Sequence, residues 1–182
     1  RYVQAFSTKV HANILSTYQP ELITSYSVEK LYKSINDFQN ILVGPGLSKN
    51  KWSLDIFKQF KKYLLKNNIE KNIIADAGFL NILSNYPFKY NNWILTPHIG
   101  EAAKLLNTDK KKIQANRLEA ATRLQEKYGG VVVLKGPGTI IRDDYDTYVC
   151  SHGNHGMGTA GMGDCLAGII LSMVSMVENK DY

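Results

Sequence analysis

The chain has 182 residues, of which 44% are hydrophobic and 21% charged, an ordinary composition for a globular domain with a sizeable core. It contains no apolar run long enough to span a bilayer and no visible signal-peptide core, so no membrane partner is expected. The formal charge is +6, but the lysines are scattered and no recognition motif accompanies them. A phosphate-bearing small substrate therefore suits this charge better than nucleic acid does.

Strands and helices alternate along the chain. In order, the sequence predicts strands at 1–7 and 21–27, a helix at 28–37, a strand at 40–43, an amphipathic helix at 51–67, strands within 72–78 and 92–98, one further helix from Ile113 to Tyr128, a buried strand at 131–136, paired strands at 138–143 and 146–150, and a last helix ending at Val177. Pro97 suits the first turn of a helix that Thr96 would cap, and Gly129 and Gly130 would end the helix before them.

This alternation predicts an α/β fold with a mostly parallel sheet covered on both faces. In such folds ligands bind at the carboxyl ends of strands. The unusual loops all follow strands, and they are Gly44-Pro45-Gly46, Asp76-Ala77-Gly78, Thr96-Pro97-His98 and Lys135-Gly136. We therefore expect these loops to share one site.

The stretch "HGNHGMGTAGMGDCLAGII" places five glycines in the eleven residues from Gly153 to Gly163, immediately before Asp164. It matches G-x-G-x-x-G, but no strong strand precedes it, and no strand with a terminal acid follows, so a dinucleotide fingerprint is disfavoured. A Walker A loop is also disfavoured, because Met162 stands where its lysine should be.

Glycines before an apolar helix favour a different interpretation. Free amides at a helix start bind anions, and glycine lets that backbone approach a phosphate closely. Asp164 beside such an anion hole could accept a proton from a hydroxyl that attacks the bound phosphoryl group. The alternative is a glycine-rich turn with Asp164 as an ordinary acid in the first turn of a helix, and the local pattern leaves both open.

Three segments of the chain carry a family resemblance. They read "ILTPHIGEAAKLL", "VVVLKGPGTII" and "GNHGMGTAGMGDCLAGII", and "ILVGPGLS" and "IIADAGFLNIL" match two further segments. In order and spacing they resemble the NAD(P)H-hydrate dehydratases, enzymes with a ribokinase-like three-layer α/β/α fold. The resemblance covers nearly the whole chain, so residues 1–182 are expected to form a single domain of this kind.

The resemblance implies an activity. Family members dehydrate the S forms of NADHX and NADPHX with magnesium and with ADP in bacteria or ATP in eukaryotes. The substrate hydroxyl is phosphorylated and phosphate then leaves, restoring NAD(P)H. The expected partners are these small molecules, in a cytoplasmic homo-oligomer.

The resemblance also implies roles for individual residues. Asp164 would be the catalytic base, next to an anion hole formed by the amides of Gly161, Met162 and Gly163. The nucleotide would contact Lys135, Gly136, Pro137, Gly138, Thr139 and Gly163, and the hydrated dinucleotide would contact Gly46, His98 and Asp164. Asn154, Asp76 and Glu101 are further candidates. Magnesium is expected to be held mainly by the nucleotide phosphates, so no protein residue is assigned as a metal ligand.

Three departures from the family pattern stand out. Asp76-Ala77-Gly78 replaces Asp-Ala-Asp, Ile99 replaces a proline, and the family's first strand with its glycine-rich loop has no counterpart before Arg1. The family's helices after Val177 also have no counterpart, so the domain is expected to be incomplete at both ends.

Two other functions remain open. A ribokinase-like kinase of a vitamin-precursor alcohol would share Asp164 and the anion hole but stop at the phosphate ester. An inactive nucleotide-binding domain would explain the altered Asp76 loop.

The two cysteines, Cys150 and Cys165, form neither a disulfide framework nor a metal-ligand pattern, which favours a reducing compartment. Cys165 is expected to be a small buried residue of the last helix.

Overall fold

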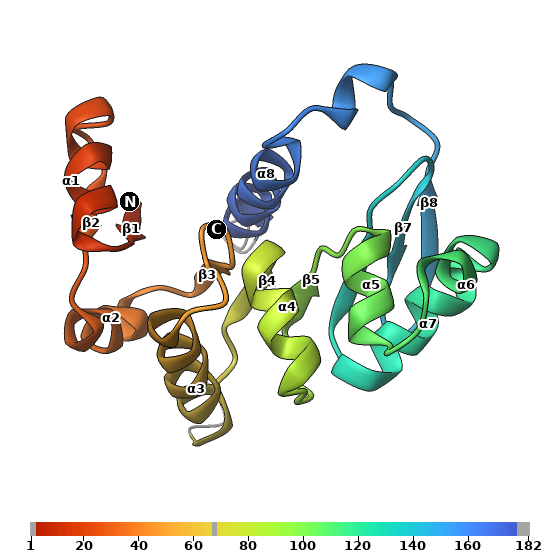
Figure 1. Cartoon of the computed structure of the whole chain (residues 1–182), viewed down its shortest axis with the longest axis horizontal. Coiled ribbons are helices and arrows are strands. Elements are labelled where there is room, and N and C mark those ends of the chain that lie inside the picture. The colour runs from red at the N-terminus through yellow and green to blue at the C-terminus, as the bar shows by residue number, and fades with distance from the viewer. Residues whose placement is uncertain (1–2, 67–68, 178–182) are drawn as a thin grey trace. The chain divides into compact units, whose positions relative to one another are not determined.

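The computed structural model describes residues 3–66 and 69–177, which fall into two compact units (Figure 1). The first unit extends to Gln39 and the second begins at Asn40. The expectation of one continuous domain stays a prediction, and each unit is described by itself.

The first unit is a small βαβ arrangement. Its elements are β1 Gln4–Phe6, α1 Lys9–Tyr18, β2 Ile23–Ser25, α2 Val28–Ser34 and a 3₁₀ turn, Ile35–Asp37. The strands β1 and β2 pair in parallel, with Gln4 opposite Ile23 and Phe6 opposite Ser25. Both strands and the helix at 28–37 are confirmed, whereas most of α1 was not predicted from the sequence. The part of the first strand that was expected before Val3 lies outside the described residues.

The second unit holds the larger sheet. Its strands are β3 Asn40–Val43, β4 Asn72–Ala75, β5 Trp93–Leu95, β6 Val131–Leu134, β7 Thr139–Arg142 and β8 Thr147–Cys150. Its helices are α3 Lys51–Lys66, α4 Ala77–Asn85, α5 Ile99–Leu105, α6 Lys110–Ala115, α7 Arg117–Tyr128 and α8 Met162–Val177, with a 3₁₀ turn at His155–Gly158. The strands follow one another in chain order across the sheet; β3 to β6 are parallel, and β7 and β8 are antiparallel.

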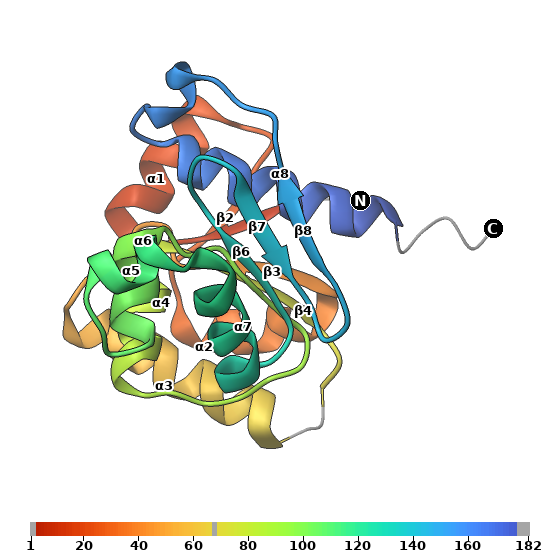
Figure 2. The ribbon, with the colours of Figure 1, turned by 90° about the vertical axis from the view of Figure 1, so that its right-hand side faces the viewer.

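Helices cover both faces of this sheet. Right-handed crossovers that step repeatedly in one direction place their helices on the same face, here α3, α4, α5 and α7. The antiparallel hairpin β7–β8 breaks this series, and α8 then packs against β3 and β4 from the opposite side (Figure 2). The predicted α/β architecture with a mostly parallel central sheet is confirmed.

Two predicted boundaries are wrong. The helix expected from Ile113 to Tyr128 is two helices, because Asn116 leaves the helical conformation and its side chain accepts a hydrogen bond from the Glu119 amide, capping α7. The helix expected at Pro97 begins later, at Ile99, with His98 as its N-cap. Pro97 still belongs to the sheet edge, since its carbonyl accepts from the Lys135 amide.

An aromatic cluster forms the core between α3, α4 and β5. Phe57 and Phe79 have ring centroids 5.0 Å apart, and Phe79 meets Trp93 edge to face at 5.6 Å. All three side chains are fully buried. Such pairs contribute about 0.5–1.5 kcal/mol each beyond the burial of their area. This core fixes the strands whose carboxyl ends carry the polar loops.

Across the described residues, none of the helices combines the length and apolarity that a membrane crossing requires.

Candidate active site

The polar loops meet at the carboxyl edge of the sheet. Backbone hydrogen bonds continue the sheet past the strands: the Asp76 amide donates to Val43, the Thr96 amide to Ala75 and the Lys135 amide to Pro97, at 2.9–3.1 Å. These bonds place the ends of β3, β4, β5 and β6 side by side. The sequence-predicted residues Asp76, His98 and Lys135 are therefore neighbours in the structure.

A buried ion pair lies at the centre of this edge. The Lys135 ammonium donates to Asp76 Oδ1 at 2.8 Å, and the two side chains are 18% and 2% exposed. A buried carboxylate is tolerated only when it is paired, so each partner depends on the other. The ammonium is thus held in place within the site, whereas an unpaired lysine would extend toward water. Asp76 also precedes α4, but its side chain does not cap that helix.

Glu101 and His98 form a capping box at the start of α5. Glu101 Oε2 accepts from the His98 amide at 2.9 Å, and His98 Nδ1 accepts from the Gly100 amide at 2.9 Å. Because Nδ1 is an acceptor, the ring proton of a neutral His98 sits on Nε2. His98 Nε2 lies 3.6 Å from Glu101 Oε2, beyond hydrogen-bond distance, and the side chain is 60% exposed, so this proton can also reach a ligand.

Burial raises the pKa of the Glu101 carboxyl, and the nearby negative charge of Asp76 adds to this effect. The hydrogen bond from His98 and the positive charge of Lys135 act in the opposite direction. Glu101 is therefore electrostatically linked to the Asp76–Lys135 pair. We call Asp76, Lys135, Glu101 and His98 the strand-end cluster.

Glycines bring the loop after β3 onto the same edge. A side chain at Gly44 would place its Cβ 1.8 Å from the Asp76 carbonyl oxygen, so only glycine fits there. Gly46 has φ +77° and open space around it. Gly46 thus follows the Gly44 contact by two residues and leaves its backbone uncovered.

The first turn of α8 approaches the cluster closely. A Cβ at Gly163 would lie 3.3 Å from Lys135 Nζ and 3.8 Å from Asp76 Oδ2. Among the described residues, the amides of Gly163 and Asp164 donate to no protein acceptor, whereas the Met162 amide donates to Thr159 at 3.2 Å. Free amides and an ammonium therefore converge at this point, and Asp164 follows in the chain with an exposed carboxylate.

The loop before α8 is braced internally. The Asn154 side chain accepts from the Gly156 amide at 2.9 Å, and the Thr159 hydroxyl donates to the Gly156 carbonyl at 2.7 Å. Asn154 therefore caps the 3₁₀ turn in this structure.

Cys165 is exposed rather than buried, because it lies about 200° around α8 from the buried Ala167.

Sequence reasoning missed Arg117, which organises the segment predicted to bind nucleotide. Its guanidinium donates to the carbonyls of Leu134, Pro137 and Gly138, and its terminal nitrogen would lie 3.0 Å from a Cβ at Gly136. Arg117 thus fixes the turn from Gly136 to Thr139 between β6 and β7. The Thr139 hydroxyl adds a hydrogen bond within the turn, to the Gly136 carbonyl. An arginine at the start of a helix carries no signal in the sequence that would reveal this contact.

A comparison with protein families assigns the chain to one of them. The family described as NAD(P)H-hydrate dehydratase matches residues 2–181. The chain belongs to this family. The resemblance of the five segments is thereby confirmed as family membership.

Similar proteins carry related names. The bifunctional NAD(P)H-hydrate repair enzyme Nnr of Coxiella burnetii is 40% identical over 168 residues, which are 91% of this chain and 33% of that protein. The ADP-dependent (S)-NAD(P)H-hydrate dehydratase of Neisseria meningitidis is 41% identical over 119 residues, 62% of this chain and 40% of that protein. The chain therefore spans about a third of the first relative and two fifths of the second.

Solved structures share the fold. A ribokinase-like protein from Enterococcus faecalis has a TM-score of 0.82 at 26% identity, covering 93% of this chain and 60% of that one. The ADP/ATP-dependent NAD(P)H-hydrate dehydratase of Bacillus subtilis, co-crystallised with ATP and Mg²⁺, has a TM-score of 0.75 at 25% identity, covering 95% and 63%. The ribokinase-like prediction is confirmed.

Proposed function

We propose that this chain carries the nucleotide-dependent dehydration of (S)-NADHX and (S)-NADPHX to NADH and NADPH, with residues 1–182 as part of a single dehydratase domain. One observation carries the proposal: the first turn of α8 brings the free amides of Gly163 and Asp164 next to the Lys135 ammonium. This is an anion hole with a carboxylate beside it, as transfer of a phosphoryl group to a hydroxyl requires.

In the proposed reaction, the Asp164 carboxylate accepts the proton of the substrate hydroxyl. The hydroxyl oxygen attacks the terminal phosphorus of the nucleotide, and the phosphoanhydride bond breaks, releasing the shortened nucleotide. The α8 amides and Lys135 stabilise the charge on the transferred group. The ring nitrogen then expels phosphate, a far better leaving group than hydroxide, and loss of a ring proton restores the dihydropyridine.

The strand-end cluster and the loops around it would position the two substrates. Gly46 would contact the hydrated dinucleotide through its backbone, and His98 would donate from Nε2. The turn from Gly136 to Thr139, held by Arg117, would receive the nucleotide on the other side of Lys135. Asn154 would shape the loop over the phosphates, while Asp76 and Glu101 would fix the position of Lys135.

We propose ADP as the phosphoryl donor. The Neisseria relative named as ADP-dependent is 41% identical, whereas the ATP-dependent dehydratase of Schizosaccharomyces pombe is 29% identical. The described residues contain no group of three His, Cys, Asp or Glu side chains that could hold a metal. Magnesium would therefore be held by the nucleotide phosphates and water, where it would offset phosphate charge.

The cellular setting is also a proposal. The two cysteines, which do not form a disulfide framework, suit a cytoplasmic protein, and the scattered lysines suit small phosphorylated substrates rather than nucleic acid. We expect a homo-oligomer, which sedimentation would reveal.

An absorbance assay tests the proposed function. The protein is mixed with (S)-NADHX, magnesium and either ADP or ATP, and the reduced-nicotinamide band is followed. Recovery with ADP alone would support both reaction and donor, and recovery with ATP alone would overturn the donor. Nucleotide binding without recovery would contradict the dehydratase assignment, and a stable phosphate ester of an added alcohol would favour the kinase alternative.

A further inference from the structure

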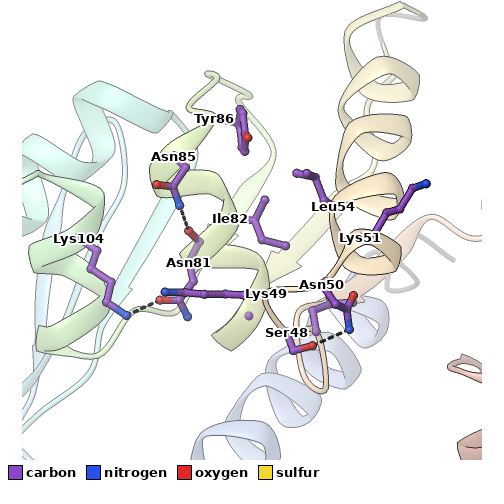
Figure 3. Close-up of a pocket in the computed structure, with 12 residues that line it drawn as sticks. Ser48, Lys49, Asn50, Lys51, Leu54, Asn81, Ile82, Asn85, Tyr86 and Lys104 are labelled. Atoms are coloured by element: carbon purple, nitrogen blue, oxygen red, sulfur yellow. Dashed lines mark hydrogen bonds between the residues drawn. The ribbon is translucent and has the colours of Figure 1, made fainter.

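A groove of about 520 Å³ leads away from the carboxyl edge between α3 and α4 (Figure 3). It begins at Leu47 and Gly78, which directly adjoin the loop of Gly46 and the end of β4. A Cβ at Gly78 would lie 2.0 Å from the Leu47 carbonyl oxygen, so glycine allows the β3–α3 loop to close onto α4 there. The groove therefore begins beside the loop and the strand end that border the candidate active site.

The end of the groove nearest this loop is polar and positively charged. Lys49 comes from the loop, Asn81 from α4 and Lys104 from α5, and Lys104 Nζ donates to Asn81 Oδ1 at 2.6 Å (Figure 3). Among the described carboxylates, none lies within ion-pair distance of Lys49 or Lys104. Two ammonium groups without acidic partners suit an anion such as a diphosphate.

The other end of the groove is apolar. Leu54 of α3 faces Ile82 of α4 and Tyr86, the residue that follows α4, as Figure 3 shows. The Tyr86 side chain is 47% exposed, which leaves an aromatic surface available to a ligand. A planar ring with an apolar face, such as a nucleobase, suits this end, because aromatic and aliphatic walls gain from stacking and area burial.

The order of these features along the groove matches one substrate. If the donor nucleotide occupies the turn after β6, a hydrated dinucleotide with its hydroxyl at Asp164 must extend the other way, over the ends of β4 and β3. It would then meet first the two lysines and afterwards the apolar walls. A dinucleotide presents its groups in this sequence: reactive ring, diphosphate, adenosine.

We propose that this groove binds the adenosine diphosphate half of the hydrated dinucleotide, with the diphosphate at Lys49 and Lys104 and the adenine against Leu54, Ile82 and Tyr86. This inference rests on the proposed function. It makes Lys49 and Lys104 residues that select a dinucleotide over a mononucleotide.

The test combines a double variant with a truncated substrate. Lys49→Gln with Lys104→Gln is compared with Lys58→Gln with Lys62→Gln, which makes the same change in charge at exposed positions of α3. Each protein is assayed with (S)-NADHX and with the hydrate of reduced nicotinamide mononucleotide, which keeps the reactive ring and lacks the adenylate.

The first pair should raise KM for (S)-NADHX about 5- to 20-fold, the range expected for two lost charge-assisted contacts. The values of kcat, of KM for the nucleotide donor and of KM for the mononucleotide should not change, and the control pair should behave as wild type. An unchanged KM for (S)-NADHX, or an equal rise for both substrates, would overturn the proposal.

A binding measurement separates this inference from the proposed function. Calorimetry with ADP-ribose, in excess non-hydrolysable ADP analogue to fill the donor site, reports the groove without turnover. Binding that the Lys49/Lys104 pair weakens and the control pair leaves intact would support the groove even if no dehydration were observed. No binding to wild type, or equal binding to all proteins, would refute it.

Discussion

Two regions of the candidate active site are held differently: the strand-end cluster, and the glycine-rich segment from Gly153 to Asp164 that leads into α8. Asp76, Lys135 and Glu101 are largely buried and fixed by an ion pair and a capping box. Asp164 and the glycines before it are mostly exposed. The contrast fits the proposed division of roles, in which the buried cluster presets the charge of the site and the exposed carboxylate exchanges a proton with substrate.

The largest effect is expected at the exposed carboxylate. Asp164→Asn removes the proposed base and keeps the amides, so kcat should fall by about 10²–10⁴-fold. Calorimetry should find nucleotide affinity nearly unchanged. Asp55→Asn, on the exposed face of α3, is the matched control and should keep full activity. Substantial activity in Asp164→Asn would mean that another group is the base.

A change within the buried cluster should instead appear in stability. Asp76→Asn leaves the Lys135 ammonium without its partner, which should cost about 3 kcal/mol of unfolding free energy in urea titrations. Replacing both residues, as Asp76→Asn with Lys135→Met, removes the unpaired charge and should recover part of this loss. If the double variant were less stable than the single one, the ion pair would not be the source of the effect.

Gly163→Ala tests the contact between the two regions. Its methyl group would lie 3.3 Å from Lys135 Nζ and displace the ammonium from the proposed phosphate position, so kcat should fall about 10- to 100-fold. Stability should be unchanged or higher, since alanine favours a helix by about 0.5–1 kcal/mol over glycine.

Gly168→Ala is the control for this helix effect, because no protein atom lies within 4 Å of a Cβ there. It should be stabilised without loss of activity. Equal activity in both alanine variants would show that Gly163 is not needed beside Lys135.

The smallest effect concerns the raised pKa of Glu101. Burial favours its protonated form, so its contribution to stability is fully present below the ordinary pKa of 4.5 and is lost as pH rises through the higher pKa of the folded state. Glu101→Gln can keep the hydrogen bond from His98 without the charge. The difference in unfolding free energy, variant minus wild type, should therefore increase as pH rises above 4.5. Urea titrations across this pH range would measure that difference. A constant difference would contradict the raised pKa.

Much of the fold followed from local patterns. The continuous apolar run of β6 and the alternation of strands with helices predicted a parallel sheet and its functional edge. The starts of α5 and α7 were predicted less accurately, because each depends on the hydrogen bonds of an N-cap side chain. His98 rather than Thr96 caps α5, and the carbonyl of Pro97 accepts instead from Lys135, 38 residues further along the chain.

The sequence by itself determined the fold class, the family and the residues worth testing, since these depend on periodicity and on motif spacing within short segments. Only the tertiary structure decided that Asp76 pairs with Lys135, that Arg117 braces the turn from Gly136 to Thr139 and that Gly163 lies against both charges of the pair. Asp76 and Lys135 are 59 positions apart, and no local pattern specifies which charges meet once parallel strands align their carboxyl ends.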